Sequence, residues 1–282
     1  SVGQHFAFAT GRTAVLQQML LAQSDVDRLL GSHDLAECER IMTELKLTSR
    51  LGALPENADA LLKMLEQWVR KEADSMAPES KRPVFDILWM DGDLPFLAYF
   101  LKRHHGLTSA VSAKPERGVT SFDPALVETL VADGTVHASL SAPLVAFVQQ
   151  VKALENPSAS DIDVIVMQYI ADQQLRLAKE SGSKDILGYV RHRIDLTNIR
   201  TAIRFINAGL TDVSASLIRG GLIPVASLGS TQENVRAAVA RSPYYAILGA
   251  DVFDLSKDAV VFERTAARIT ADDIGRMWNV PL

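Results

Sequence analysis

Cysteine is almost absent from this sequence, since Cys38 is the only one among 282 residues. A single cysteine cannot form a disulfide within the chain, which favours a reducing compartment. Together with His33 it also falls short of a zinc site, which needs three or four protein ligands. We therefore expect no metal here and predict that Cys38 is a small core residue of a helix over 34–45.

Aromatic residues, long apolar runs and concentrated positive charge are also scarce. Aromatic residues make up 6% of the chain while Ala and Leu are plentiful, a balance that favours helix over strand. No segment reaches the roughly 18 apolar residues that a membrane-spanning helix needs. The net charge is −5, and basic residues alternate with acids, which disfavours nucleic acid as a partner. We expect a cytoplasmic protein whose membrane contact, if it has any, comes through another protein.

Motifs of the common enzyme classes are missing as well. Gly220-Gly221 is followed by Leu-Ile-Pro and lacks the Gly-Lys-Ser/Thr end of a phosphate-binding loop. Gly-x-Ser-x-Gly, the hydrolase nucleophile motif, is absent. The acid pairs Asp161/Asp163 and Asp272/Asp273 coincide with expected helix starts, where capping explains them. We therefore predict that the chain is not an enzyme, with no catalytic residue, bound cofactor or metal.

His104-His105 invites a metal-site interpretation, but neighbouring positions on a helix point roughly 100° apart and do not chelate one ion simply. Both precede Gly106, which is placed to end a helix. A protonated histidine is favourable at the negative end of a helix, so we expect that role instead.

Helix-start signals recur along the chain. Asp123-Pro124 is a cap followed by proline at the first helical position, and Gly31, Gly106 and Gly209 are placed to end helices. Capping-box patterns, in which a cap residue is followed three positions later by an acid, occur at Ser24–Asp27, Asp34–Glu37, Ser160–Asp163, Ser230–Glu233 and Thr270–Asp273. The sequence predicts an all-α fold with short connections.

Two segments of the chain resemble each other. Residues 93–108 and 195–211 both begin Asp-Leu and end Gly-Leu-Thr, and Asp-Ile-Leu precedes each one. Their apolar positions also share the spacing i, i+3, i+7: Leu94, Leu97 and Leu101 correspond to Leu196, Ile199 and Ile203. Chance likeness between two amphipathic helices is the alternative to duplication.

The copies start about one hundred positions apart, which suggests a repeated helical domain. We predict three pseudo-repeated helical lobes at residues 1–110, 111–210 and 211–282. A third copy of the repeated helix is not found before Leu282, so we expect the third lobe to be incomplete, either as a short variant or for want of a C-terminal segment.

These features resemble the C/AC39 family (also called d) of V-type and archaeal-type ATPase components. The segment 190–204 resembles the recurring acid–aliphatic–x–Asn–aliphatic–Lys/Arg helix of that family, with Asp195, Asn198, Arg200 and Arg204 in the matching places. The start at Phe6–Val15 resembles the family's aromatic-Ala-x-Ala-x-x-Arg opening, and the helix with Tyr169 its tyrosine-bearing helix. The first copy departs from the pattern with Pro95-Phe96.

The resemblance implies a funnel of three helical lobes that sits on the membrane proteolipid ring and holds the shaft subunits D and F. Such a protein belongs to the rotor of an ATPase that works in ion transport, proton transport or ATP synthesis, and makes or breaks no bond itself. Two other classes stay open: a generic all-α scaffold or adaptor in another complex, and an all-α enzyme with an unrecognised pocket.

Helix 190–206 is the best candidate for a partner-binding element. Apolar spacing places Leu196, Ile199, Ile203 and Ile206 toward the core. The candidate partner-binding residues, expected to face solvent or the shaft, are Arg193, Asn198, Arg200 and Arg204. Arginine suits such a surface because its planar guanidinium binds carboxylates with two hydrogen bonds. Arg191 and Asp195, four positions apart, are expected to pair on the surface.

Overall fold

A computed structural model describes residues 25, 28, 34–46, 60, 64, 67, 68, 70, 71, 75, 82–107, 113–115, 120–249 and 251–279. These residues form helices and connections and contain no strand, which confirms the all-α prediction. They also include no helix long and apolar enough to cross a bilayer. The chain divides into two compact units, Ser1–Trp89 with Pro115–Val119, and Met90–Lys114 with Thr120–Leu282.

The first unit contains helices α3 (Leu35–Glu44) and α6 (Arg82–Trp89). Asp34 caps α3 as predicted, because its carboxylate accepts a hydrogen bond from the Glu37 backbone N–H at 2.7 Å. Ile41, Met42 and Ile87 are buried. Cys38 lies in α3, but its side chain lies outside the described residues, as do Ser24 and Asp27 of the predicted cap, Gly31 and the Phe6–Val15 opening.

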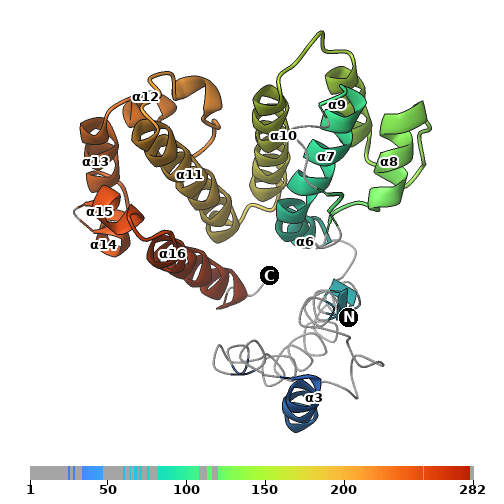
Figure 1. Cartoon of the computed structure of the whole chain (residues 1–282), viewed down its shortest axis with the longest axis horizontal. Helices are drawn as coiled ribbons and strands as arrows, with labels where there is room; N and C mark the ends of the chain where they lie inside the picture. Colours follow the sequence, from blue (N-terminus) through green and yellow to red (C-terminus); the bar gives the residue numbers. More distant parts are fainter. Residues whose placement is uncertain are drawn as a thin grey trace. The chain divides into compact units, whose positions relative to one another are not determined.

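The second unit begins with the 3-10 turn η2 (Met90–Gly92) and contains most of the described chain. Figure 1 labels its α-helices, which are numbered in the order of the sequence. Their bounds are α7 (Asp93–His104), α8 (Pro124–Asp133), α9 (Ala142–Lys152), α10 (Ala159–Glu180), α11 (Lys184–Asn207), η4 (Ser214–Ser216), α12 (Val225–Leu228), α13 (Gln232–Ala240), α14 (Tyr245–Leu248), α15 (Val252–Ser256) and α16 (Ala259–Asn279).

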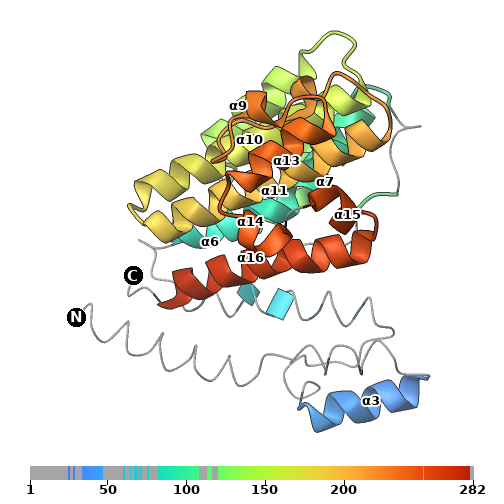
Figure 2. The same cartoon turned by 90° about the vertical axis from the view of Figure 1, so that its left-hand side faces the viewer.

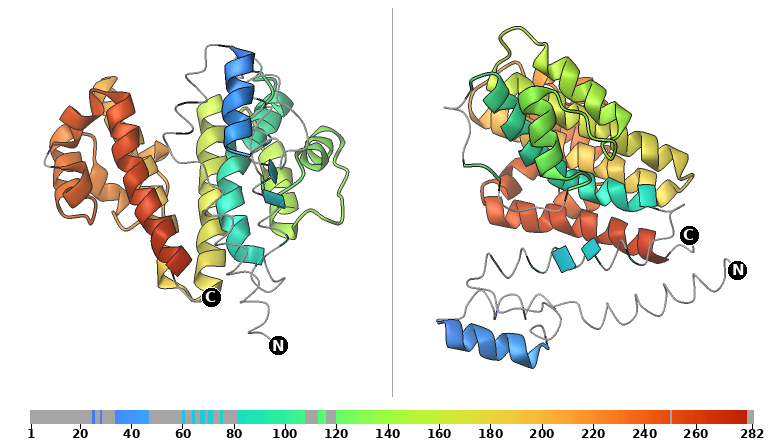
Figure 3. Two further views of the ribbon diagram at one scale, coloured as in Figure 1. Left: turned by 90° about the horizontal axis from the view of Figure 1, so that it is seen from below. Right: turned by 90° about the vertical axis from the view of Figure 1, so that its right-hand side faces the viewer.

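Two hydrophobic clusters form the core of this unit. The first cluster joins α7, α8, α9 and α10 around side chains such as Leu97, Leu101 and Val166. Figure 3 (right) shows these helices from the side of α8 and α9. The second cluster joins α11 through α16 around side chains such as Ile199 and Tyr244. In Figure 2, α16 runs along the second cluster beside α14 and α15, with which it is in contact. Helices α10 and α11 pack together and connect the two clusters.

Several predicted helix ends are confirmed. Asp123 caps α8 with Pro124 at the first helical position. Gly106 and Gly209 follow α7 and α11 with φ values of +70° and +72°. At both ends the N–H of the residue after the glycine donates back to a helix carbonyl: Leu107 N to Lys102 O and Leu210 N to Phe205 O. The left-handed conformation at both positions explains why glycine occurs there.

Other predicted helix starts are wrong. The capping box of α10 is Ser158 with Asp161, two positions before the expected Ser160–Asp163, and α13 is capped by Thr231. Thr270–Asp273 starts no helix because it lies inside the 21-residue α16. A capping pattern is local in sequence, whereas the apolar face of α16, with Phe262, Ala266 and Ile269 buried, carries the helix through it.

The two repeated segments have related but unequal helices. Residues 184–207 form one continuous helix, whereas the first copy has separate elements at 82–89, 90–92 and 93–104. Pro95 explains the difference, because its ring would clash with the carbonyl of Asp91 in a continuous α-helix. Proline is tolerated in the first turn of α7, where its missing N–H is not needed. The apolar correspondence holds at Leu97 and Leu101 and at Ile199 and Ile203, which are all buried. The division into lobes at 1–110, 111–210 and 211–282 stays a prediction.

Candidate functional site: the polar residues of helix α11

Helix α11 is well defined at both ends and carries several of the buried polar contacts of the second unit. Ser183 caps its N-terminus by accepting a hydrogen bond from Ile186 N, and Gly209 follows its C-terminus. One side of the helix is buried, including Leu196, Ile199 and Ile203. The predicted core face is thereby confirmed at these three positions, and Ile206 is partly buried against the same cluster.

Three of the four predicted partner-binding residues lie on one exposed side of α11. Arg193, Arg200 and Arg204 are spaced by seven and four positions, which places them in one row. Asn198 is not in that row, because five positions from Arg193 correspond to about 140° around a helix. Its side chain is 1% exposed. The amide of Asn198 donates to Ile218 O at 2.7 Å and accepts from Ile218 N at 2.8 Å. The expectation that Asn198 faces solvent or a partner is wrong, because a buried loop backbone needs its two hydrogen bonds.

Arg193 is held by an acid of the same unit. Its guanidinium lies 2.8 Å from Oδ2 of Asp91 in η2. Asp91 also accepts hydrogen bonds from Tyr189 Oη at 3.0 Å and from Gln174 Nε2 at 2.9 Å. Burial, together with the nearby Asp91 charge, raises the pKa of Tyr189, so its hydroxyl remains a donor. Asp91 thus connects η2 with α10 and α11. We refer to Asp91, Gln174, Tyr189 and Arg193 together as the Asp91 joint.

Arg200 and Arg204 differ in their contacts. Arg200 forms a bidentate ion pair with Glu263 of α16, with distances of 2.6 and 2.8 Å. Both side chains are half-exposed, so the pair contributes at most about 1 kcal/mol. Arg204 is exposed and lies over the ring of Phe205, 5.9 Å from its centroid. Within the described part of the chain, Arg204 has no acidic partner.

Asp195 is the most buried charged residue of α11, with an exposed fraction of 0%. Its carboxylate accepts hydrogen bonds from Leu222 N at 2.9 Å, from Ile223 N at 3.1 Å and from the hydroxyl of Tyr244. Burial raises the pKa of Asp195, and the three donors act in the opposite direction. The expected surface pair with Arg191 is therefore wrong. Helical spacing contained a signal for burial, because Asp195 lies four positions before Ile199 on the core side.

Asp93 of the first cluster makes a contact like that of Asp195. It is 3% exposed and accepts hydrogen bonds from Ser121 N at 2.7 Å and Ser121 Oγ at 2.6 Å. Ser121 lies 28 positions after Asp93, and Ile223 lies 28 positions after Asp195. In both repeated segments the acid of Asp-Leu thus binds the backbone of the following loop. Sequence comparison alone did not reveal this common role.

His192 and Asp273 form a second partly buried pair between α11 and α16. Nδ1 of His192 donates to Oδ2 of Asp273 at 2.8 Å, and Arg276 also binds Asp273. The His192 ring meets Tyr244 edge to face, with 5.4 Å between centroids. This set therefore adjoins the Asp195 contacts and binds the C-terminal helix to α11.

His104 and His105 lie at the end of α7, as expected. Nε2 of His105 donates to Val151 O at 2.9 Å. Burial and the charge of Lys152 lower the pKa of His104, which disfavours the protonated form that we expected at the helix end. No group of three metal-ligating side chains occurs among the residues that the structure describes.

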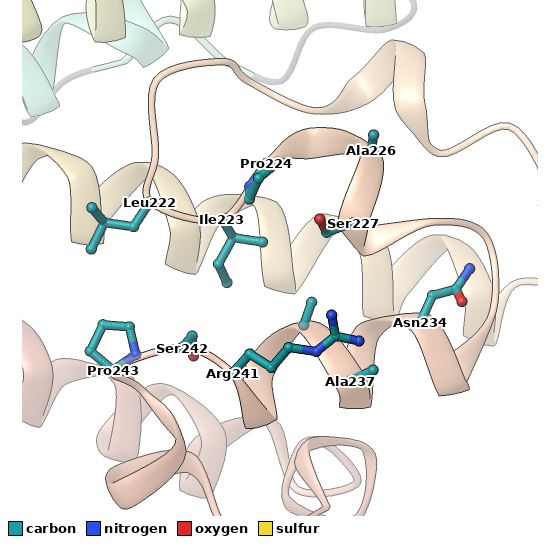
Figure 4. A pocket seen from close by; sticks show the side chains of 11 residues that line it. Leu222, Ile223, Pro224, Ala226, Ser227, Asn234, Ala237, Arg241, Ser242 and Pro243 are labelled. Atoms are coloured by element: carbon teal, nitrogen blue, oxygen red, sulfur yellow. The ribbon is translucent and has the colours of Figure 1, made fainter.

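A groove of about 560 Å³ lies beside the Asp195 contacts. One wall is the segment 222–227 and the other is formed by α13 and the turn at 241–243 (Figure 4). Tyr244-Tyr245 follows this turn. Tyr244 is buried as a loop anchor, whereas Tyr245 is 44% exposed, so the two do not form one exposed pair.

Residues 9–277 match the family model described as the ATP synthase (C/AC39) subunit. The chain belongs to this family. The resemblance noted in the sequence is thereby confirmed, and this C/AC39 protein is an accessory component of a V/A-type ATPase. Its partners accordingly lie within such a complex. No curated protein matches the chain.

Proposed function

We propose that this C/AC39 protein is a non-catalytic rotor part that couples the central shaft, subunits D and F, to the membrane proteolipid ring. The family match over residues 9–277 is the observation that carries the proposal. In this role the protein passes torque between ATP chemistry elsewhere in the complex and ion movement in the membrane. It would serve ion transport, proton transport or ATP synthesis and lie at the membrane surface as a peripheral component.

Torque transmission requires that the part does not deform under load, and the contacts of α11 suit this requirement. The Asp91 joint binds α11 to η2 and α10 near its middle. Asp195 and His192 bind it to the loop at 222–223, to Tyr244 and to α16. Buried hydrogen bonds to a charged group contribute about 1.5–3 kcal/mol each, more than exposed ion pairs do. Asp195 is buried with three donors, so its contacts are costly to break one at a time.

Arg204 is the first candidate for the partner contact among the predicted residues. Its charge is not matched by an acid within the described residues, whereas Arg193 and Arg200 are already engaged by Asp91 and Glu263. A partner could recruit either of these two only by competing with its internal acid. We therefore propose Arg204 as the primary contact on α11, with Arg193 and Arg200 in supporting positions.

Binding to both neighbours at once is the property that tests the proposal. Purified chain should be titrated with the D–F complex and, separately, with the detergent-solubilised proteolipid ring of the same ATPase. We expect both to bind, and a ternary assembly to form when all three are mixed, as measured by size-exclusion chromatography with light scattering. Arg204→Glu should weaken one of the two binary complexes. A chain that binds neither would contradict the coupling role.

A further inference from the structure

Apolar residues lie on both sides of the groove between residues 222–227 and 241–243. Leu222, Pro224 and Pro243 lie along its two sides in Figure 4, and Leu222 is 43% exposed. Concave sites lined by apolar side chains and a few polar groups are where proteins commonly bind ligands. The volume of about 560 Å³ falls in the range of sites that take a small ligand or a few side chains.

Both walls of the groove are held by one buried carboxylate. Leu222 N and Ile223 N of one wall donate to Asp195, and so does the hydroxyl of Tyr244, which directly follows Pro243 of the other wall. Gly221 permits the loop to approach this closely, because a Cβ at that position would lie 1.9 Å from Asp195 Oδ1. The groove is therefore formed in the unbound chain, which lowers the entropic cost of binding.

Arg241 gives the groove its charge. Among the described residues that line the groove it is the only charged one, and the others are apolar, Ser or Asn. Its side chain is exposed, and in the described part of the chain it forms no ion pair or side-chain hydrogen bond. A guanidinium beside apolar surface is complementary to a carboxylate, which it binds with two parallel hydrogen bonds.

We propose that this groove docks a carboxylate-bearing segment of another protein of the ATPase. Arg241 binds the carboxylate, while Leu222 and Pro243 contact apolar side chains that flank it. Asp195 and Tyr244 act as positioning residues because they hold the two walls apart at a fixed spacing. The proposal rests on the coupling function, and it assigns a contact separate from Arg204 on α11.

Charge reversal at Arg241 tests the proposed pairing. The full-length chain and its Arg241→Glu, Arg241→Lys and Arg268→Glu variants are titrated with the D–F complex and with the solubilised ring. Arg268 is the matched control, since it is exposed on α16 and outside the groove. We expect Arg241→Glu to weaken one complex about tenfold or more, Arg241→Lys to weaken it less, and Arg268→Glu to leave it unchanged.

A photo-cross-linker at Ser227, which lines the groove, identifies the segment that docks there. The same group at Ala146, exposed on α9, is the control. Cross-links from Ser227 to an Asp- or Glu-containing peptide of one ATPase protein, absent from Ala146, would support the proposal. Unchanged affinity of Arg241→Glu for both probes, or a cross-link to a second copy of this chain, would overturn it. If the unmodified chain binds neither probe, the coupling function itself is contradicted. That result differs from a loss of binding in the Arg241 variants alone, which concerns only the groove.

Discussion

The hydroxyl of Tyr244 donates a hydrogen bond to the carboxylate of Asp195, 49 residues earlier in the chain. The exposed fractions of these two residues are 1% and 0%, so water does not replace the contact. Because Asp195 also accepts from Leu222 N and Ile223 N, one side chain joins α11, the loop after it and the turn before α14.

Removing the hydroxyl of Tyr244 should destabilise the second cluster. Tyr244→Phe leaves Asp195 with one donor fewer in a buried place, which costs about 1–3 kcal/mol. Tyr245→Phe is the control, since Tyr245 is 44% exposed and should change stability by less than about 0.5 kcal/mol. Urea unfolding followed by circular dichroism measures both variants. Equal losses in the two would show that the Asp195 contact contributes nothing.

Asp195 should also give stability a pH dependence of known sign. Burial raises its pKa above the ordinary value of 3.8, so the folded chain keeps this proton to higher pH than the unfolded chain does. The stabilisation that protonated Asp195 gives the folded chain is fully present below the pKa of the unfolded state. It is lost as pH rises through the raised pKa of the folded state. The free energy of unfolding of the wild type relative to Asp195→Asn should therefore fall with rising pH across this window. Urea unfolding of both proteins at several pH values checks the sign, and a rise would contradict it.

Two glycines should respond oppositely to the same substitution. Gly221→Ala places a Cβ 1.9 Å from Asp195 Oδ1 and should separate the loop from the carboxylate, with a loss of about 2 kcal/mol or more. Gly188→Ala, inside α11 with no atom within 4 Å of the added Cβ, should stabilise the chain by about 0.5–1 kcal/mol. Thermal melts of both variants suffice. Stabilisation by Gly221→Ala would refute the close approach.

Substitutions on the buried face of α11 should unfold the second cluster, whereas substitutions on its exposed face should leave the fold intact. Ile199 is 0% exposed, so Ile199→Asp places a charge in the core and should unfold the second cluster. Arg200→Glu should keep the fold, at a cost of about 1 kcal/mol from the lost pair with Glu263. The double variant Arg200→Glu, Glu263→Arg should recover that loss. Circular dichroism melts compare the three, and similar melting losses for Ile199→Asp and Arg200→Glu would contradict the face assignment.

The sequence predicted the parts of this fold that depend on local chemistry. Gly106 and Gly209 end helices because the left-handed conformation there suits glycine, and Ile199 is buried because helical spacing places it in the core. Asp195 and Asn198 were expected at the surface because they are polar. Their burial depends on loop N–H and C=O groups 20–28 positions away, which no local pattern specifies.

The candidate site was predictable to the same extent. The row of Arg193, Arg200 and Arg204 follows from their spacing alone. The acids that engage the first two, Asp91 and Glu263, lie 102 and 63 positions away along the chain, beyond the reach of helical periodicity. The groove at Arg241 was not predicted, because its two walls are brought together by tertiary packing and by the contacts of Asp195 with residues 27–49 positions away.

The ratio of ion movement to ATP hydrolysis tests the coupling role most directly. The ATPase is reconstituted into vesicles with and without this chain, ATP turnover is measured, and a voltage-sensitive dye follows the membrane potential. The account predicts that without the chain hydrolysis continues while the potential falls to background, and that added chain restores it. An equal potential per ATP hydrolysed in its absence would contradict the account.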